Sequence, residues 1–263
     1  MDRNRILQRN RTSWNAQVKK ENRWTVAVGP TEIQQARDGK PEIVLTPCKT
    51  VPMHWFPKLD GCPTLMLASG GGQQSPIMAA AGAKVTVLDI SDAQLEQDRK
   101  VAQREDLEIQ TVQGSMDDLS SFSDETFDLI VHPCSNSFIP ELAPVWKEAA
   151  RVLKSGGRIM SGFCNPFIFL FDDEAIANGK LDVIHSLPYS DESCLTRDRL
   201  QALEAEDEPL MFGHTLSSQL GGQTAAGLAI IDMYEDVWGA DDDGYSVLDK
   251  HTASFLATLS QKL

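Results

Sequence analysis

A regular alternation of short apolar runs with helix-like segments, between residues 64 and 163, constrains the fold more than any other feature. Five of these runs have the length and the apolar or β-branched content of buried strands: 64–68, 84–90, 107–112, 127–132 and 158–163. The helix between the last two is the most periodic, and the letters "KSGG" predict its exit at Gly156. Strands that alternate with helices in this way predict a parallel sheet with helices on both faces.

The end of the chain extends this pattern. Residues 215–227 are expected to form a helix, and residues 228–235 and 253–261 two further strands. No crossover helix fits between these two strands, so they are expected to pair antiparallel. The predicted fold class is therefore α/β, a Rossmann-like doubly wound sheet of about seven strands, mostly parallel with an antiparallel closing strand.

The chain divides into a core and two less regular segments. Residues 1–60 contain three of the five tryptophans and a cluster of prolines, which predicts an N-terminal lid or arm made of helices and extended chain. Residues 61–263 are expected to form the core domain. Within that core, the acidic and irregular stretch 164–214 is expected to be a variable insertion.

Charge argues against a nucleic-acid partner, because phosphate contacts need basic surface and the net charge is −14. Residues 1–24 nevertheless carry a local balance of +5. The favoured interpretation is a basic helix docked on an acidic body, and the alternative is an arm that contacts RNA.

Other classes of protein are excluded by simple patterns. No run of eighteen apolar residues could span a membrane, and the first residues lack the apolar segment of a secretory signal. The five cysteines are far apart and form no CxxC pair, which favours reduced thiols in the cytoplasm over disulfides or a zinc site.

The first predicted strand runs into a glycine loop, which reads "LASGGGQQSP" over residues 67–76. Ser75 and Pro76 resemble a helix start, and Asp89 closes the second strand 17 residues after Gly72. Glycines let backbone N–H groups approach a ligand, and a carboxylate at the second strand end can bind ribose hydroxyls. The pattern predicts a nucleoside-containing ligand at the carboxyl ends of the strands. The alternative is that Asp89 only caps the next helix.

Five motifs in order resemble those of the class I S-adenosylmethionine-dependent methyltransferases, in particular the small-molecule type related to ubiquinone and menaquinone biosynthesis enzymes. These motifs read "LMLASGGG", "VLDIS", "VQGSMDDLSSFSDETFDLIVH", "WKEAARVLKSGGRIMSGF" and "FLATLSQK". The likeness covers residues 64–163 and, more weakly, 215–261. It implies S-adenosylmethionine as cofactor and a small molecule as methyl acceptor.

The resemblance also implies which residues bind the cofactor. The glycine loop would approach the methionine moiety, Asp89 the ribose, Ile90 the adenine face and the following loop the adenine edge. His132, at the tip of the fourth strand, falls where the family lines the methyl end. The implied set is Ser69, Gly70, Gly71, Gly72, Asp89, Ile90, Ser115, Met116, Asp117 and His132. Three positions depart from the family pattern: Met66 replaces an acidic residue, Ala68 the usual first glycine, and Ser115 an aspartate for which Asp117 could substitute.

Methyl transfer by in-line displacement needs little from a protein beyond positioning and exclusion of water. A general base is required only when the acceptor must lose a proton, and His132 is the candidate; the alternative is that it only lines the pocket. Candidate acceptor contacts are Trp14, Trp24, Asn136 and Phe138. His132 with Cys134 is too small a set for a metal site, so none is expected.

Two other functions share these features. One is an NAD(P)-dependent oxidoreductase, which uses the same glycine loop and ribose carboxylate, although the sequence has no Tyr-x-x-x-Lys pair. The other is a non-catalytic S-adenosylmethionine-binding protein. The acceptor, its nucleophilic atom and the oligomeric state are not specified by these patterns.

Overall fold

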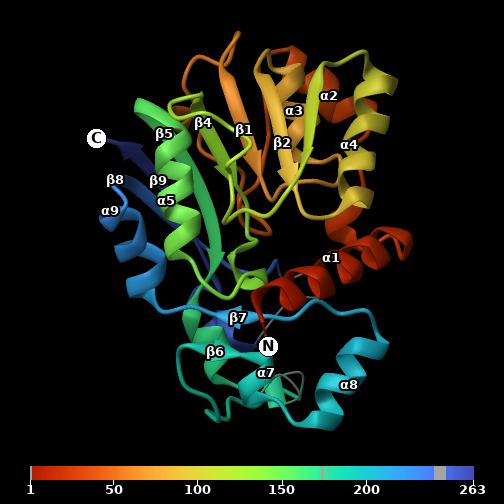
Figure 1. Ribbon diagram of the computed structural model, residues 1–263, viewed down its shortest axis with the longest axis vertical. Coiled ribbons are helices and arrows are strands. Elements are labelled where there is room, and N and C mark those ends of the chain that lie inside the picture. Colours follow the sequence, from red (N-terminus) through yellow and green to blue (C-terminus); the bar gives the residue numbers. More distant parts are fainter. Residues whose placement is uncertain (1, 173–174, 177, 240–246) are drawn as a thin grey trace.

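The computed structural model describes residues 2–172, 175–176, 178–239 and 247–263. Its centre is a seven-stranded sheet in the order β3-β2-β1-β4-β5-β9-β8 (Figure 1). The strands are β1 Pro63–Leu67, β2 Lys84–Asp89, β3 Ile109–Gln113, β4 Phe127–His132, β5 Leu153–Cys164, β8 Leu228–Asp236 and β9 Phe255–Lys262. The first five run parallel, and β9 pairs antiparallel with both β5 and β8. The predicted fold class is confirmed.

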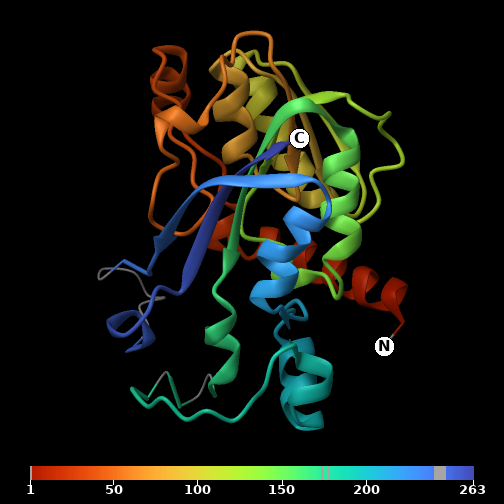
Figure 2. The same cartoon turned by 90° about the vertical axis from the view of Figure 1, so that its left-hand side faces the viewer.

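Helices cover both faces of the sheet (Figures 1 and 2). One face carries α2 Pro30–Arg37, α3 Gln74–Ala80 and α4 Asp92–Glu105, and the other carries α5 Ala143–Val152 and α9 Gly222–Ala225. Strand alternation places Met66 in the first core, and Leu65 and Leu67 in the second. At α4 the predicted start is confirmed, because the Ser91 hydroxyl accepts a hydrogen bond from Gln94 N.

The predicted end of the helix between β4 and β5 is wrong. Helix α5 ends at Val152, and β5 begins at once with Leu153, which pairs with Phe127. The "KSGG" letters therefore lie inside the first part of β5. Sheet pairing with β4 decides the boundary here, a tertiary contact that local turn signals do not report.

The basic N-terminal helix, α1 Arg3–Lys19, lies across the carboxyl ends of the parallel strands (Figure 1). Arg3 pairs with Asp117 (2.6 Å) and Arg11 with Asp92 (2.7 Å). Docking of a basic helix on an acidic body is therefore confirmed. Among the helices in the described ranges, none combines the length and apolar character needed to cross a membrane.

A small layer formed by residues 164–214 lies beyond α1, on the same side of the sheet (Figure 1). Its described residues include the two-stranded sheet of β6 Tyr189–Ser190 and β7 Phe212–Gly213, and the helices α7 Asp191–Cys194 and α8 Arg197–Ala205. Asn10 of α1 ties this layer to the body, because its side chain bonds the carbonyl and the N–H of Leu210.

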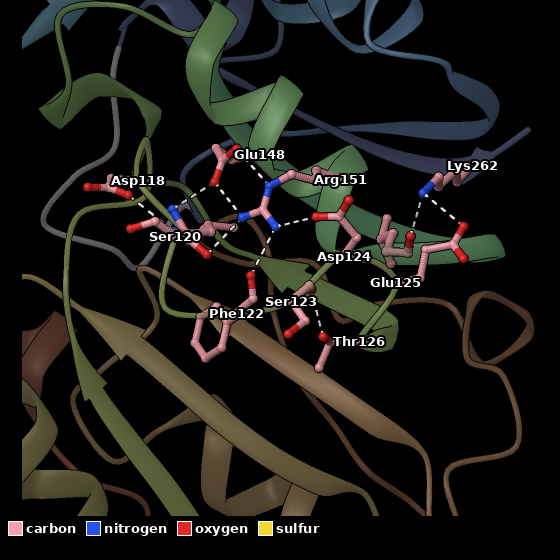
Figure 3. Close-up of polar contacts among 12 residues, drawn as sticks. Asp118, Ser120, Phe122, Ser123, Asp124, Glu125, Thr126, Glu148, Arg151 and Lys262 are labelled. Carbon is pink, nitrogen blue, oxygen red and sulfur yellow. Dashed lines mark hydrogen bonds and ion pairs between the residues drawn. The ribbon is translucent and has the colours of Figure 1, made fainter.

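Arg151, near the end of α5, anchors the loop between β3 and β4 (Figure 3). Its guanidinium donates to the carbonyls of Leu119 (2.8 Å) and Phe122 (2.9 Å) and forms ion pairs with Asp124 and Glu148. Arg151 also holds the pKa of Glu148 below its usual value. The same loop carries residues 114–116, which reach the cavity described below.

Replacing Arg151 with alanine is expected to lower the free energy of unfolding by about 2 kcal/mol, because two carbonyls and two carboxylates lose a partly buried, charged donor. Urea denaturation measures the change. Arg99→Ala is the matched control, since Arg99 forms an exposed pair with Glu96 whose loss costs about 0–1 kcal/mol. Equal stability of the two variants would contradict the anchoring role.

Candidate functional site

A cavity of about 350 Å³ lies at the carboxyl edge of the parallel strands, under α1. Residues that follow β1, β2, β3 and β4 line it, together with Cys164 at the end of β5. In open α/β sheets this edge is where ligands bind, because the loops there are free to carry functional groups.

The glycine loop follows β1 and turns sharply into α3. Ala68 already adopts a left-handed conformation (φ 49°), at the position where the resembling family has glycine. Ser69 and Gly70 then line the cavity. A Cβ on Gly70 would lie 2.7 Å from the Gln94 Cβ and 3.0 Å from an Asp89 carboxylate oxygen, so only glycine fits.

Gly71 and Gly72 do not line this cavity. Their N–H groups donate to the two carboxylate oxygens of Asp98, each at 3.2 Å. Burial, reinforced by the charge of Asp89, raises the pKa of Asp98 to about 8. Asp98 is not among the site residues predicted from the sequence, although one signal pointed to it: Asp98 shares the buried stripe of α4 with Leu95 and Ala102.

Asp89 occupies the end of β2 and lines the cavity. Its carboxylate accepts hydrogen bonds from Gly70 N (3.0 Å) and Ser91 N (2.8 Å). Burial raises its pKa to about 6, with the two backbone donors acting in the opposite direction. At neutral pH the group is therefore ionised, and each oxygen has further lone pairs for a ligand.

The neighbouring predicted contacts divide into two groups. Ile90, Ser115 and Met116 line the cavity beside Asp89. Asp117 does not line it: its carboxylate accepts hydrogen bonds from Arg3 and from the Ser115 hydroxyl. Asp117 thus joins α1 to the loop after β3.

Besides the Thr46 hydroxyl, two polar atoms at the cavity wall lack a partner in the described part of the chain. They are the Ser69 hydroxyl and the Gln94 side-chain carbonyl, both buried. Buried polar groups normally have hydrogen-bond partners, so their position beside Asp89 suits a ligand that carries hydroxyl and amino groups. S-adenosylmethionine, with a ribose and an amino acid end, fits this donor and acceptor set.

His132 is placed differently from the sequence interpretation. It is fully buried and does not line the cavity. Its Nδ1 lies 2.9 Å from the Leu67 carbonyl and its Nε2 lies 2.7 Å from the Asn136 side chain, which in turn donates to Gln219. Burial lowers the pKa of His132. The structure therefore places His132 and Asn136 in an internal hydrogen-bond network. Pro133 and Ser135, which follow the same strand, line the cavity instead.

Aromatic side chains close the other end of the cavity. Trp14 of α1 and Phe138 meet edge to face, 5.0 Å between ring centroids, and both line it. Trp24 also lines the cavity, and the Arg23 guanidinium carbon lies over its ring, 4.4 Å from the ring centroid. Trp55 packs elsewhere and donates to Asp232.

Four residues that line the cavity are not among those predicted from the sequence: Trp238, Phe255, Met211 and Cys164. These residues come from β5, β9, the segment before β7 and the segment after β8, far apart in the chain. Across the described ranges, His, Cys, Asp and Glu side chains nowhere gather in a group of three that could hold a metal ion.

The chain is similar to several known proteins. Residues 65–161 match a family described as "Methyltransferase domain". An uncharacterized methyltransferase of Bacillus subtilis, YbaJ, is 49% identical over 99% of this chain and 100% of its own. A demethylmenaquinone methyltransferase of Clavibacter sepedonicus is 35% identical over 36% of this chain and 38% of its own. A solved S-adenosylmethionine-dependent methyltransferase of Mesorhizobium loti shares the fold, with a TM-score of 0.58, 16% identity, and coverage of 80% of this chain and 94% of that one.

Proposed function

The chain belongs to the methyltransferase family, and we propose that it transfers the methyl group of S-adenosylmethionine to a small-molecule acceptor by in-line displacement. The observation that carries the proposal is the ionised, buried Asp89 at the cavity wall, beside Gly70 and the unpartnered Ser69 hydroxyl. None of the findings favours the oxidoreductase or the binding-only alternative.

When bound, the cofactor supplies an electrophilic methyl carbon on a sulfonium. Asp89 would accept hydrogen bonds from the ribose hydroxyls, because its two oxygens are the ionised acceptors that line the cavity. Ser69, Gly70 and Gln94 would contact the polar end of the cofactor, and Ile90 and Met116 would pack on the adenine. Asp98 acts indirectly, by holding the N–H groups of Gly71 and Gly72 and with them the shape of the loop.

The acceptor would occupy the aromatic end of the cavity, against Trp14, Trp24 and Phe138. In this proposal residues 1–60 act as the lid, since α1 and the segment at Trp24 cover the cavity, and the insertion at 164–214 shapes the acceptor side. The methyl carbon would leave the sulfonium, which becomes the neutral thioether of S-adenosylhomocysteine, and bond to the nucleophilic atom of the acceptor. This displacement requires alignment and a dry site, and a proton is released only where the acceptor carries one. His132 would serve to position the end of β4 through Leu67 and Asn136.

Isothermal titration tests the proposal. S-adenosylmethionine and S-adenosylhomocysteine are expected to bind one site per chain, whereas NADH is expected not to bind. Transfer of labelled methyl groups to a small-metabolite extract then separates an enzyme from a binding protein. Binding of NADH without S-adenosylmethionine would overturn the proposal.

The affinity for S-adenosylhomocysteine is expected to depend on pH through Asp89. Ribose hydroxyls donate best to the ionised carboxylate, and the pKa of Asp89 in the free protein is about 6. Affinity should therefore be constant above about pH 7 and fall below pH 6, approaching tenfold per pH unit. The Asp89→Asn variant has no titrating carboxyl at position 89, whereas the neighbouring Asp98 is retained. A decline that persists in Asp89→Asn would assign the effect to another group.

A further inference from the structure

A second cavity, of about 500 Å³, lies in the layer formed by the insertion. Its walls come from the turn at Pro166–Leu170, from β6 and α7, and from Leu248 and Ser254 near the end of the chain. This layer lies on the carboxyl-end side of the sheet, as the first cavity does (Figure 1).

The two cavities meet at Met211 and Trp238, which line both. The Met211 backbone is held in place by Asp191, which accepts from Met211 N at 2.7 Å and donates its own N–H to the Met211 carbonyl. The Trp238 ring packs edge to face on Phe255, 4.8 Å between centroids, and Phe255 lines the first cavity. Two side chains therefore form the shared wall.

The first cavity is small for two reactants. Its 350 Å³ lies at the lower end of the roughly 300–1,000 Å³ that a single drug-sized ligand fills. The polar half, at Ser69, Gly70 and Asp89, suits the cofactor. What remains, at Trp14 and Phe138, has room for the reacting end of an acceptor, and the second cavity, which adjoins the first at Met211 and Trp238, has room for its body.

The charge of the first cavity opposes an anion at the methylated end of the acceptor. Among the described residues that line the first cavity, Asp89 is the only Asp, Glu, Lys, Arg or His. The second cavity has charged side chains of both signs. Asp191 accepts from the Tyr189 hydroxyl (2.8 Å) and Asp172 from Ala175 N (2.7 Å), and the wall also contains Arg199 and His185. The remaining wall is mainly aromatic and aliphatic, with Phe169, Phe171, Ile168 and Ile184. An uncharged, apolar ligand is desolvated there at little cost.

We propose that the methyl acceptor is an uncharged, elongated and mainly apolar molecule, with its methylated end in the first cavity and its body in the second, passing between Met211 and Trp238. This inference rests on the proposed function. It assigns the second cavity as the acceptor-body site and Met211 and Trp238 as the residues that determine how long an acceptor can be.

The test uses the full chain saturated with S-adenosylhomocysteine and three probes: phenol, 4-hexylphenol and 4-hexylbenzoate. By isothermal titration, 4-hexylphenol is expected to bind at least about tenfold more tightly than phenol, because its alkyl chain is buried in the second cavity. The anionic 4-hexylbenzoate is expected to bind at least about tenfold more weakly than 4-hexylphenol. Trp238→Phe should reduce the change in tryptophan fluorescence that 4-hexylphenol causes.

Two neighbouring variants separate specific binding from general hydrophobic adsorption. Ile184 lines the second cavity and is 55% exposed, whereas Val183 is 65% exposed and does not line it. Ile184→Asp is expected to lower the affinity for 4-hexylphenol at least about fivefold and to leave the affinities for phenol and S-adenosylhomocysteine unchanged. Val183→Asp is expected to leave all three affinities unchanged. Equal affinities for phenol and 4-hexylphenol, tight binding of 4-hexylbenzoate, or equal effects of the two variants would overturn the inference. Failure of S-adenosylhomocysteine to bind would instead overturn the proposed function on which it rests.

Discussion

Asp89→Ala is expected to raise the Kd for S-adenosylhomocysteine about a hundredfold or more. The side chain is 8% exposed, lines the cavity and is ionised at neutral pH, so its oxygens are strong acceptors in a site with little water. Two charge-assisted hydrogen bonds to a ribose, at about 1.5–3 kcal/mol each, account for a change of this size. Isothermal titration measures it directly.

Two controls accompany this variant. Asp89→Asn keeps one acceptor oxygen and should lose about tenfold in affinity, so its Kd should lie between those of the wild type and Asp89→Ala. Asp128→Ala removes a carboxylate from the same sheet, where Asp128 pairs with Lys154 at a half-exposed position, and should leave the Kd unchanged. An unchanged Kd in Asp89→Ala would mean that the ribose does not lie at this carboxylate.

Gly162→Ala is expected to lower the free energy of unfolding by about 3 kcal/mol or more. Gly162 lies in β5, and a Cβ there would be 2.0 Å from the Leu45 carbonyl oxygen and 2.6 Å from the Leu45 carbonyl carbon. These are backbone atoms, so the clash is relieved only by lifting the segment around Leu45 off the sheet. That segment also accepts a hydrogen bond from Cys134 N (3.0 Å) and lines the first cavity, so ligand affinity should fall as well.

Urea denaturation with Gly221→Ala as control tests this expectation. A Cβ on Gly221 meets nothing within 4 Å, and its φ of −63° is helical, so alanine should be neutral or stabilise by up to about 1 kcal/mol. If Gly162→Ala were as stable as Gly221→Ala, residues 43–46 would not be packed on the sheet as described. The N-terminal arm would then be a weakly attached cover rather than part of the cavity wall.

The fold was predictable because each of its signals is local. Short apolar runs, the Ser91 cap and the alternation of strands with helices depend on residues close in sequence. The failure at "KSGG" has the opposite cause. Leu153 extends the strand because it meets Phe127, a partner 26 positions earlier in the chain.

The candidate site was predictable only as far as chain position determines it. Gly70, Asp89, Ile90 and Met116 line the cavity because residues just after parallel strands meet at one edge. Chain position does not determine the direction in which each side chain points. His132 is one residue away from the cavity-lining Pro133, yet it points into the core, where Leu67 and Asn136 hold it.

By itself, then, the sequence determined the order and type of the core elements, the location of the glycine loop and the carboxylate at the second strand end, since these depend on short-range patterns. Only the tertiary structure decided that the N–H groups of Gly71 and Gly72 donate to Asp98, and that Met211 and Trp238 line both cavities. Such contacts join residues from about 26 to more than 100 positions apart, and packing of the folded chain alone brings them together.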